Sequence, residues 1–359
     1  YNIFNYHKFL FTIKDKIITF VVVKLLRKIL FPFVPLYYVV VFLRNKLYDW
    51  SFLKSKSYEF PLICVGNLSV GGTGKTPMVE YLISFLNKNY QLAILSRGYG
   101  RASKGFVIAG LTTASKDIGD EPFQIFNKFE DVIVAVDSDR QNGLQILKNE
   151  HPSAEIVLLD DAFQHRKVLA GFNILLTAYD QLYCNDFVLP TGNLREPKSG
   201  AKRAQVIIVT KCPDTISVQH KIDVIKRLNP QPYQNIFFST IRYSNMLISS
   251  NGSRPLTDLK GTSFTLVTGI ANPMPLVAYL TSIGLDFEHL NYKDHHDFSE
   301  SEEELIYSKS LVLTTEKDFS RLNTKAHNGL FYLPIQLIID RAEKFESLVT
   351  SYVKHYDAS

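Results

Sequence analysis

The chain has 359 residues, which is more than one compact domain usually needs, so two domains are expected. With 46% apolar and 21% charged residues it has the composition of a globular protein, without low-complexity tracts. The net charge of +5 belongs to one end, because residues 1–50 carry eight Lys and Arg against two Asp. A basic surface spread over the molecule is therefore not expected, and we predict no nucleic-acid partner.

The basic N-terminal segment is also strongly apolar, since residues 17–43 read IITFVVVKLLRKILFPFVPLYYVVVFL. Its longest uncharged run, residues 29–43, would span roughly 22 Å as a helix, less than the roughly 30 Å hydrocarbon core of a membrane. Pro32 and Pro35 also interrupt this run. A cleaved signal peptide is disfavoured because no small-residue cleavage site follows.

Three interpretations of this segment stay open: a transmembrane helix with snorkelling charges, a helix packed on the domain behind it, and a bent helix in the membrane interface. We favour the interfacial helix. Lys24, Arg27 and Lys28 share one helical face, from which they can reach anionic headgroups. Residues 1–50 are thus predicted to be a membrane-associated helical segment, with the membrane surface as a partner.

A glycine-rich loop follows the short apolar stretch at 61–65 and precedes helical periodicity over 78–88. The loop reads GNLSVGGTGKT over 66–76, and this order of strand, loop and helix is typical of a phosphate-binding P-loop. Its glycines let backbone N–H groups turn toward an anion, while Lys75 suits the β- and γ-phosphates and Thr76 suits Mg²⁺. Ser69 stands where the general pattern has glycine. The predicted nucleotide-binding residues are Ser69, Val70, Gly71, Gly72, Thr73, Gly74, Lys75 and Thr76.

Two carboxylates end a second apolar stretch, since residues 156–161 read IVLLDD. Ligands of a parallel α/β sheet gather at the carboxyl ends of its strands. Asp160 and Asp161 therefore suit a magnesium site together with Thr76, although strand-end aspartates also serve as helix caps.

Several further motifs occur in an order that resembles the tetraacyldisaccharide 4′-kinase family of lipid A biosynthesis. They are SRGYGR (96–101), GDEP (119–122), DDAFQH (160–165), LPTGNLREP (189–197), VTGIANP (267–273), DHHDF (294–298) and TEKD (315–318). Ala162, Thr191 and Asn193 depart from the family pattern. The resemblance implies transfer of the ATP γ-phosphate to the 4′-hydroxyl of a tetraacylated glucosamine disaccharide 1-phosphate. It also implies a place at the cytoplasmic face of the bacterial inner membrane.

The resemblance implies an Asp–His pair as the base, which we assign to Asp120 and His295, with His296 as the second candidate. A carboxylate hydrogen-bonded to an imidazole is a base suited to neutral pH. From the residues alone, a helix cap at Asp120 and histidines in a solvated loop are the preferred interpretation, and the resemblance reverses this preference.

Other polar residues of these motifs are candidates for binding the acceptor or the metal. Arg97 and Arg140 suit the anomeric phosphate of the acceptor or the nucleotide, because arginine binds phosphate in bidentate fashion. Tyr99 and His165 are candidates for the sugar site, and Glu196 for the metal or for positioning the acceptor. Each of them also suits an ordinary surface ion pair or hydrogen bond.

Short apolar strands alternate with helical stretches up to about residue 235, which predicts a P-loop NTPase-like α/β fold with a mostly parallel sheet. Beyond it, residues 237–249 alternate like paired strands and begin a second, smaller α/β domain. We therefore predict a P-loop kinase domain over 51–235 and a smaller domain over 236–359 that closes the active-site cleft. Two alternative functions stay open, a membrane-associated P-loop ATPase or GTPase switch and a nucleotide-sensing adaptor.

Overall fold

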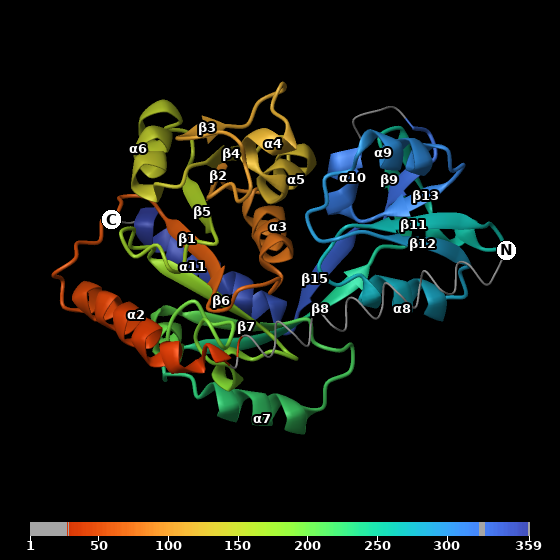
Figure 1. Ribbon diagram of the computed structural model, residues 1–359. Coiled ribbons are helices and arrows are strands. Elements are labelled where there is room, and N and C mark those ends of the chain that lie inside the picture. The colour runs from red at the N-terminus through yellow and green to blue at the C-terminus, as the bar shows by residue number, and fades with distance from the viewer. Residues whose placement is uncertain (1–26, 28, 323–326, 358–359) are drawn as a thin grey trace.

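The computed structural model describes residue 27, residues 29–322 and residues 327–357, and it folds into two lobes (Figure 1). The large lobe is built on a nine-stranded sheet and the small lobe on a six-stranded sheet, counted within these residues. The predicted fold class is confirmed. The predicted boundary at residue 235 stays a prediction.

The large sheet has the strand order β15-β8-β7-β6-β1-β5-β2-β4-β3. All neighbours from β8 to β4 are parallel, and the two edge strands, β3 and β15, are antiparallel to theirs. The strands are β1 (Leu62–Asn67), β2 (Leu92–Ser96), β3 (Val107–Ile108), β4 (Ile133–Val136), β5 (Ile156–Asp160), β6 (Phe172–Ala178), β7 (Val206–Thr210), β8 (Asn235–Tyr243) and β15 (Ile335–Ile339).

Helices bury both faces of this sheet, which explains why its strands are continuous apolar runs. Successive residues of β1 enter opposite cores: Cys64 packs with the side chains of α6 and α7, and Ile63 packs with those of α3 and α11. The helices of this lobe are α3 (Lys75–Leu86), α4 (Ser115–Ile118), α5 (Asp120–Lys128), α6 (Arg140–Glu150), α7 (Val218–Leu228) and α11 (Ala342–Asp357), with short 3-10 turns at Tyr183–Asn185 and Lys198–Arg203.

The small sheet has the order β10-β9-β14-β13-β11-β12, in which β14, β13, β11 and β12 run parallel. Its elements are β9 (Met246–Ser249), β10 (Gly252–Pro255), a 3-10 turn (Leu256–Leu259), β11 (Phe264–Thr268), α8 (Met274–Ser282), β12 (Phe287–Asn291), α9 (Glu300–Tyr307), β13 (Val312–Thr314), α10 (Glu316–Leu322) and β14 (Leu330–Tyr332). Helix α9 begins with a capping box, which Ser299 and Glu302 form.

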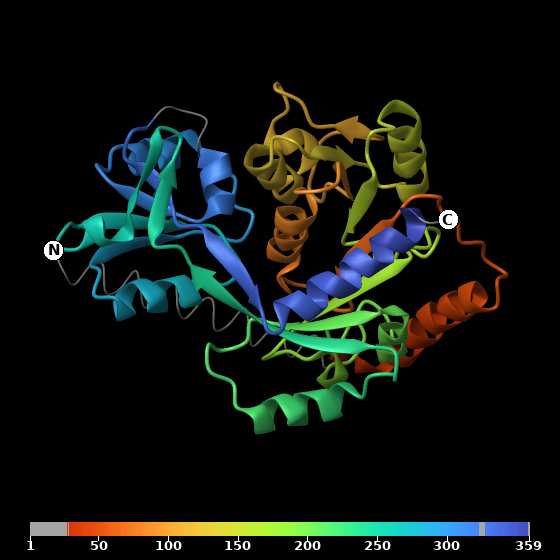
Figure 2. The ribbon, with the colours of Figure 1, turned by 180° about the vertical axis from the view of Figure 1, so that it is seen from behind.

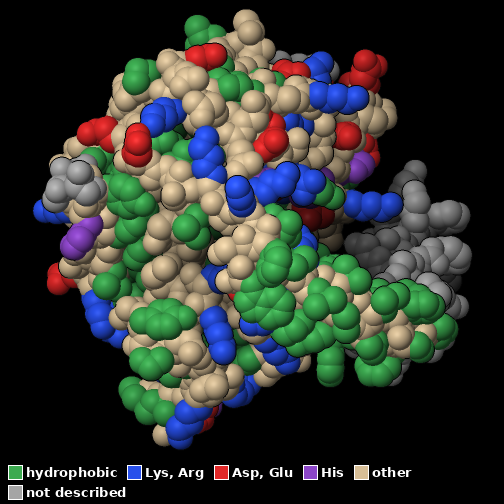
Figure 3. Space-filling view, turned by 90° about the vertical axis from the view of Figure 1, so that its left-hand side faces the viewer, with side chains coloured by type: hydrophobic (Ala, Val, Ile, Leu, Met, Phe, Trp, Pro, Cys, Tyr) green, Lys and Arg blue, Asp and Glu red, His purple; other side chains and the backbone are tan. Residues whose placement is uncertain are grey.

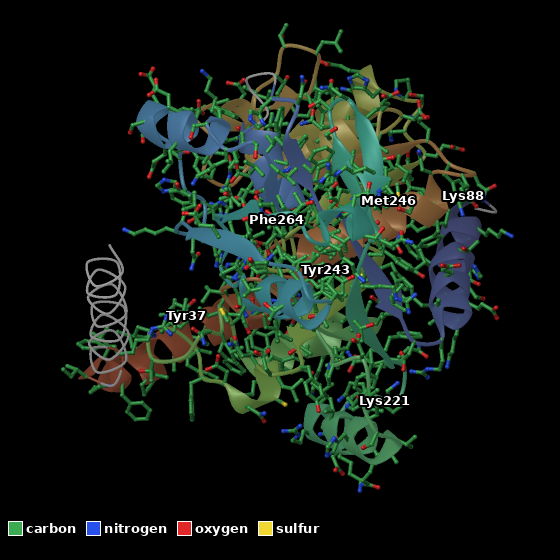
Figure 4. The ribbon with its side chains drawn as sticks, turned by 90° about the vertical axis from the view of Figure 1, so that its right-hand side faces the viewer. Tyr37, Lys88, Lys221, Tyr243, Met246 and Phe264 are labelled. Carbon is green, nitrogen blue, oxygen red and sulfur yellow. The ribbon has the colours of Figure 1, made fainter. Side chains whose placement is uncertain are left out.

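The lobes are joined by two antiparallel strands, β8 leaving the large sheet and β15 returning to it (Figure 2). The expectation that residues 237–249 form paired strands is wrong, since β8 belongs to the large sheet and β9 to the small one. Period-two alternation identifies a strand but not its partner. Tyr243, at the end of β8, stacks on Tyr279 of α8 with ring centroids 4.5 Å apart, and Figure 4 labels it near Met246 and Phe264 of the small lobe.

Helix α2 (Val34–Asp49) follows a 3-10 turn at Phe31–Phe33 and lies against the large lobe. Pro32 and Pro35 are the second residues of these two elements, within the first turn, where proline is tolerated because no intrahelical N–H bond is lost. No helix in the described part of the chain is long and apolar enough to cross a membrane. Lys24 and Lys28, part of the predicted basic face, lie outside the described residues.

Candidate active site

The glycine loop between β1 and α3 has the backbone that the motif predicts. Gly71 and Gly74 have φ of 105° and 85°, values that glycine adopts without steric cost, and Gly74 caps the N-terminus of α3. Two buried hydrogen bonds brace the loop at Thr73, one from Asn67 Nδ2 to its Oγ1 at 2.8 Å and one from Thr210 Oγ1 to its carbonyl at 2.7 Å. The helix N-terminus and the loop N–H groups together form an anion-binding cradle.

Ser69 is accommodated because the first part of the loop is extended. Ser69 forms a β-bridge with Leu194, and the N–H of Val70 donates to the carbonyl of Asn193 at 2.8 Å. Both partners come from the LPTGNLREP segment. No tight turn is needed at this point, so the glycine of the general pattern is dispensable here.

The two strand-end carboxylates lie beside the loop in different environments. Asp160 is buried at the end of β5 and accepts a hydrogen bond from Ser96 Oγ at 3.0 Å. Asp161 has φ of 47° and lies 3.7 Å from Lys75 Nζ. Burial and the neighbouring Asp161 raise the pKa of Asp160 to about 6, with a smaller contribution in the same direction from Glu121 of α5. The site therefore favours an added positive charge.

These groups fit a magnesium ion brought in with a nucleotide. Two carboxylates and the Thr76 hydroxyl at the start of α3 are hard oxygen donors of the kind that Mg²⁺ binds in phosphate-transfer sites. Within the described residues there is no cluster of three or more His, Cys, Asp or Glu side chains that would hold a metal by itself. The site is thus suited to a metal whose other ligands are phosphate oxygens and water.

A second cluster joins the lobes. Nδ1 of His295, from the loop after β12, lies 2.8 Å from Oδ2 of Asp120 in α5. Lys317 Nζ lies 3.1 Å from the other ring nitrogen, Nε2. Nδ1 is thus the ring nitrogen that faces Asp120, and Nε2 is the one that faces Lys317. Burial acts to raise the pKa of Asp120, but Arg321 and His295 hold it below its ordinary value.

The adjacent residues His295 and His296 have different surroundings. The ring of Tyr99, which is 75% exposed, lies edge-on to that of His295 at 6.2 Å. His296 points elsewhere, with its Nε2 2.9 Å from Glu302 and its ring stacked on Tyr292. The structure thus brings Tyr99 and His295 together with Asp120 and leaves His296 within the small lobe.

The remaining candidates for binding the acceptor or the metal differ in how many of their polar atoms already bond to the protein. Arg140 is only 2% exposed, and its guanidinium donates to the carbonyls of Asp137 and Asp160, so it braces the end of β5. Arg97 is exposed beside Tyr99. The two oxygens of Glu196 accept four hydrogen bonds, which favours a structural role; the donors are Asn45, Gln164 and Arg203, the last with two N–H groups.

His165 is the most perturbed histidine of the candidate set. Burial, with a further contribution from Arg140, lowers its pKa to about 4. Its Nε2 is buried without a hydrogen-bond partner in the part of the chain that the structure describes. The ring is therefore held in its neutral form at neutral pH.

Two arginines of the site were not predicted from the sequence. Arg195 Nη1 donates to both oxygens of Asp161, at 3.0 and 3.1 Å, and Nη2 donates to Asn67. Its place in the LREP motif, next to Glu196, could have indicated that Arg195 belongs to the site. Arg321 contacts Asp120 from the small lobe, and its position three residues after TEKD gave no such signal.

A phosphate cradle, a strand-end carboxylate pair and a mostly parallel sheet define a P-loop nucleotide-dependent phosphotransferase. The family model described as tetraacyldisaccharide-1-P 4′-kinase matches residues 26–354. The chain belongs to this family, which confirms the resemblance and the prediction of an ATP-dependent kinase.

Individual relatives agree over most of the chain. A tetraacyldisaccharide 4′-kinase of Flavobacterium psychrophilum is 49% identical over 337 residues, covering 92% of this chain and 97% of that protein. One from Porphyromonas gingivalis is 36% identical, with coverage of 92% and 98%. The structure superposes on the "apo" form of LpxK from Aquifex aeolicus in complex with ATP, with a TM-score of 0.74, 33% identity and coverage of 91% and 99%.

Proposed function

We propose that the protein transfers the γ-phosphate of ATP to the 4′-hydroxyl of a tetraacylated glucosamine disaccharide 1-phosphate. The observation that carries the proposal is the Asp120–His295 pair, 2.8 Å apart across the lobe interface. Glu121, next to Asp120, acts electrostatically on Asp160, which supports one shared site for base and nucleotide. Family membership supports the choice of acceptor.

The loop N–H groups and Lys75 hold the β- and γ-phosphates in this proposal, and Thr76, Asp160 and Asp161 hold Mg²⁺. When bound, the ion neutralises charge that develops on the phosphate oxygens. The 4′-oxygen bonds to the γ-phosphorus while the bond from that phosphorus to the β–γ bridging oxygen breaks. The hydroxyl proton passes to the Asp120–His295 pair and ADP leaves. Arg97, Tyr99 and His165 are the proposed contacts to the sugar and its phosphate.

The lipid chains of the acceptor require an apolar surface, and α2 with the turn before it offers one. Phe33, Leu36 and Val40 are 57%, 64% and 58% exposed. With Tyr37, Leu189 and Pro190 they line an apolar hollow of about 590 Å³. Figure 3 shows hydrophobic side chains gathered at the lower right of this face, with Lys and Arg side chains at their border. We propose that this face contacts the cytoplasmic side of the bacterial inner membrane.

Hydrogen bonds and a buried tyrosine fix α2 on the large lobe and so link the membrane face to the site. Tyr37, labelled in Figure 4, donates from Oη to the carbonyl of Arg195 at 2.8 Å. Asn45 Nδ2 donates to Glu196 at 2.8 Å, and Tyr48 is buried. The helix thus serves both as a packed element and, in our proposal, as the membrane contact.

The test is incubation of purified protein with Mg²⁺ and γ-labelled ATP, with and without tetraacyldisaccharide 1-phosphate in detergent micelles. We expect label in the lipid, dependent on the acceptor and lost in Lys75→Ala. Label released as free phosphate at the same rate without lipid would instead support a P-loop ATPase switch. Nucleotide binding with no turnover under either condition would support an adaptor.

A further inference from the structure

The TEKD segment begins α10, and the mechanism above gives it no role. Figure 1 shows α10 of the small lobe facing α5 of the large lobe, and the two helices are in contact. Asp318, the last residue of the motif, is fully buried and points back into the small lobe. It forms an ion pair with Arg321, which lies one turn further along α10.

Arg321 connects this buried aspartate to the proposed base. Its side chain is 8% exposed, Nη1 donates to Asp318 Oδ1 at 3.3 Å, and Nη2 donates to Asp120 Oδ2. The same Nη2 lies 3.2 Å from His295 Nδ1. One guanidinium thus touches both members of the pair while anchored in its own lobe.

Asp318, which anchors Arg321, is itself held by the VTGIANP segment. Asp318 Oδ2 accepts from the N–H of Gly269 at 2.8 Å and from Thr315 Oγ1 at 2.7 Å. The carbonyl of Gly269 accepts from the backbone N–H of His295 at 3.2 Å. A Cβ at position 269 would lie 2.9 Å from Asp318 Oδ1, so glycine allows this close approach. Gly269 therefore holds both ends of a closed network: Asp318, Arg321, Asp120 and His295.

We propose that Arg321, held by Asp318, is a positioning residue that fixes the Asp120 carboxylate against His295 and completes the base when the lobes meet. A guanidinium offers donors in a rigid fork, so it can hold Asp318 and Asp120 at once, whereas the single ammonium group of a lysine replaces only part of this. Asp120 belongs to the large lobe and the other three residues to the small lobe. The four groups consequently meet only where α10 contacts α5. This inference rests on the proposed function, because it acts through the Asp120–His295 pair.

Other ion pairs also cross the lobe interface, and they supply a control. Glu316, on the same helix as Arg321, pairs with Lys128 of α5 at 2.9 Å. Lys128 also pairs with Glu80 at 2.8 Å, within the large lobe. The substitution Glu316→Gln therefore removes an interlobe ion pair without touching the base and without leaving Lys128 unpaired.

The experiment measures lipid phosphorylation by the full-length protein for Arg321→Gln, Arg321→Lys and Glu316→Gln. We expect Arg321→Gln to lower kcat by roughly 10²-fold with little change in the KM for ATP, because misplacing a catalytic group costs about that much. Arg321→Lys and millimolar guanidinium chloride added to Arg321→Gln should each restore part of the loss. In an Asp120→Asn background, Arg321→Gln should cause no further loss.

Three outcomes would overturn the inference: an unchanged or raised kcat in Arg321→Gln, an equal loss in Glu316→Gln, or full additivity with Asp120→Asn. If Arg321→Gln fails to fold because Asp318 is left unpaired, Arg321→Gln with Asp318→Asn removes that charge and is measured instead. Failure of the proposed function looks different. There, the wild-type protein itself would put no label into the lipid, before any variant is compared.

Discussion

Asp120 and His295 are 175 positions apart in the sequence and lie in different lobes, yet Oδ2 of Asp120 and Nδ1 of His295 are 2.8 Å apart. His295 has φ of 55°, a left-handed conformation that a residue other than glycine rarely adopts. Such conformations cluster at functional sites, where the surrounding structure imposes them. The loop after β12 is thus shaped to deliver one of its two histidines to the partner lobe.

The adjacent histidines form a matched pair for testing the base. We expect His295→Asn to lower kcat by about 10²- to 10⁴-fold, the usual contribution of general-base catalysis. His296→Asn should stay near the wild-type rate, because that ring contacts Glu302 and Tyr292 within the small lobe. Steady-state lipid phosphorylation, with ATP affinity measured separately, checks both. An equal loss in the two variants would contradict the assignment.

The left-handed backbone of Gly74 in the glycine loop predicts that an alanine at this position is destabilising. Gly74→Ala should cost on the order of 1 to 2 kcal/mol, because an alanine pays that much for a left-handed conformation. Gly74 has φ of 85°, and an added Cβ would meet Thr210 only at ordinary contact distances, so strain and not crowding is the cause. We expect weaker ATP binding in a fluorescent-nucleotide titration and a lower Tm.

Gly110→Ala is the control for this substitution, since an added Cβ there meets nothing within 4 Å and no left-handed φ is required. It should leave ATP affinity and Tm close to wild type. Wild-type ATP affinity in Gly74→Ala would show that the loop does not need this backbone shape to bind the nucleotide.

The exposed apolar face of α2 predicts that a charged side chain on it weakens membrane binding. Leu36→Asp should reduce binding to vesicles of phosphatidylethanolamine and phosphatidylglycerol by roughly tenfold, since burying a leucine is worth about 1.5 to 3 kcal/mol. Flotation of the full-length protein with the vesicles measures this, and ATP binding should not change. Val218→Asp on α7 is the control, because Val218 is 75% exposed on another element. Equal loss in both variants, or no loss in Leu36→Asp, would contradict a membrane contact through α2.

Much of the large lobe could be predicted because its local signals are strong. The stretch IVLLD forms β5 over Ile156–Asp160 and places its aspartate at the carboxyl end, as an apolar run followed by charge indicates. The loop before α3 was equally clear, because glycine, lysine and threonine at that spacing serve one physical purpose. In both cases the signal lies within a few neighbouring residues.

What could not be predicted depends on contacts between distant residues. Strands β8 and β9 alternate alike but enter different sheets, and nothing in their own residues specifies the partner strand. Arg321 reaches Asp120 across 201 positions, so its role follows only from how α10 docks on α5. The burial of Arg140 has the same origin, because its helix α6 packs on β2. An arginine in a sequence does not reveal whether it faces a ligand or a backbone carbonyl.

The partly buried ring of His165 predicts a specific dependence of stability on pH. Its pKa is lowered to about 4 by burial and by Arg140, while an unfolded histidine titrates near 6.5. Between these two pKa values the folded state therefore binds fewer protons than the unfolded state. The contribution of His165 to the free energy of unfolding is thus complete above pH 6.5 and is lost as the pH falls toward 4. Between pH 7 and pH 5 the loss should be on the order of 2 kcal/mol.

Urea denaturation of wild type and His165→Asn at the two pH values measures this contribution. The variant lacks the titrating ring, so its loss of unfolding free energy between pH 7 and pH 5 should be smaller by about 2 kcal/mol. His220→Asn, at an exposed position on α7, should keep the wild-type difference. If His165→Asn also keeps the wild-type difference, His165 is not buried in the neutral form, and its proposed place beside the sugar would lose its electrostatic basis.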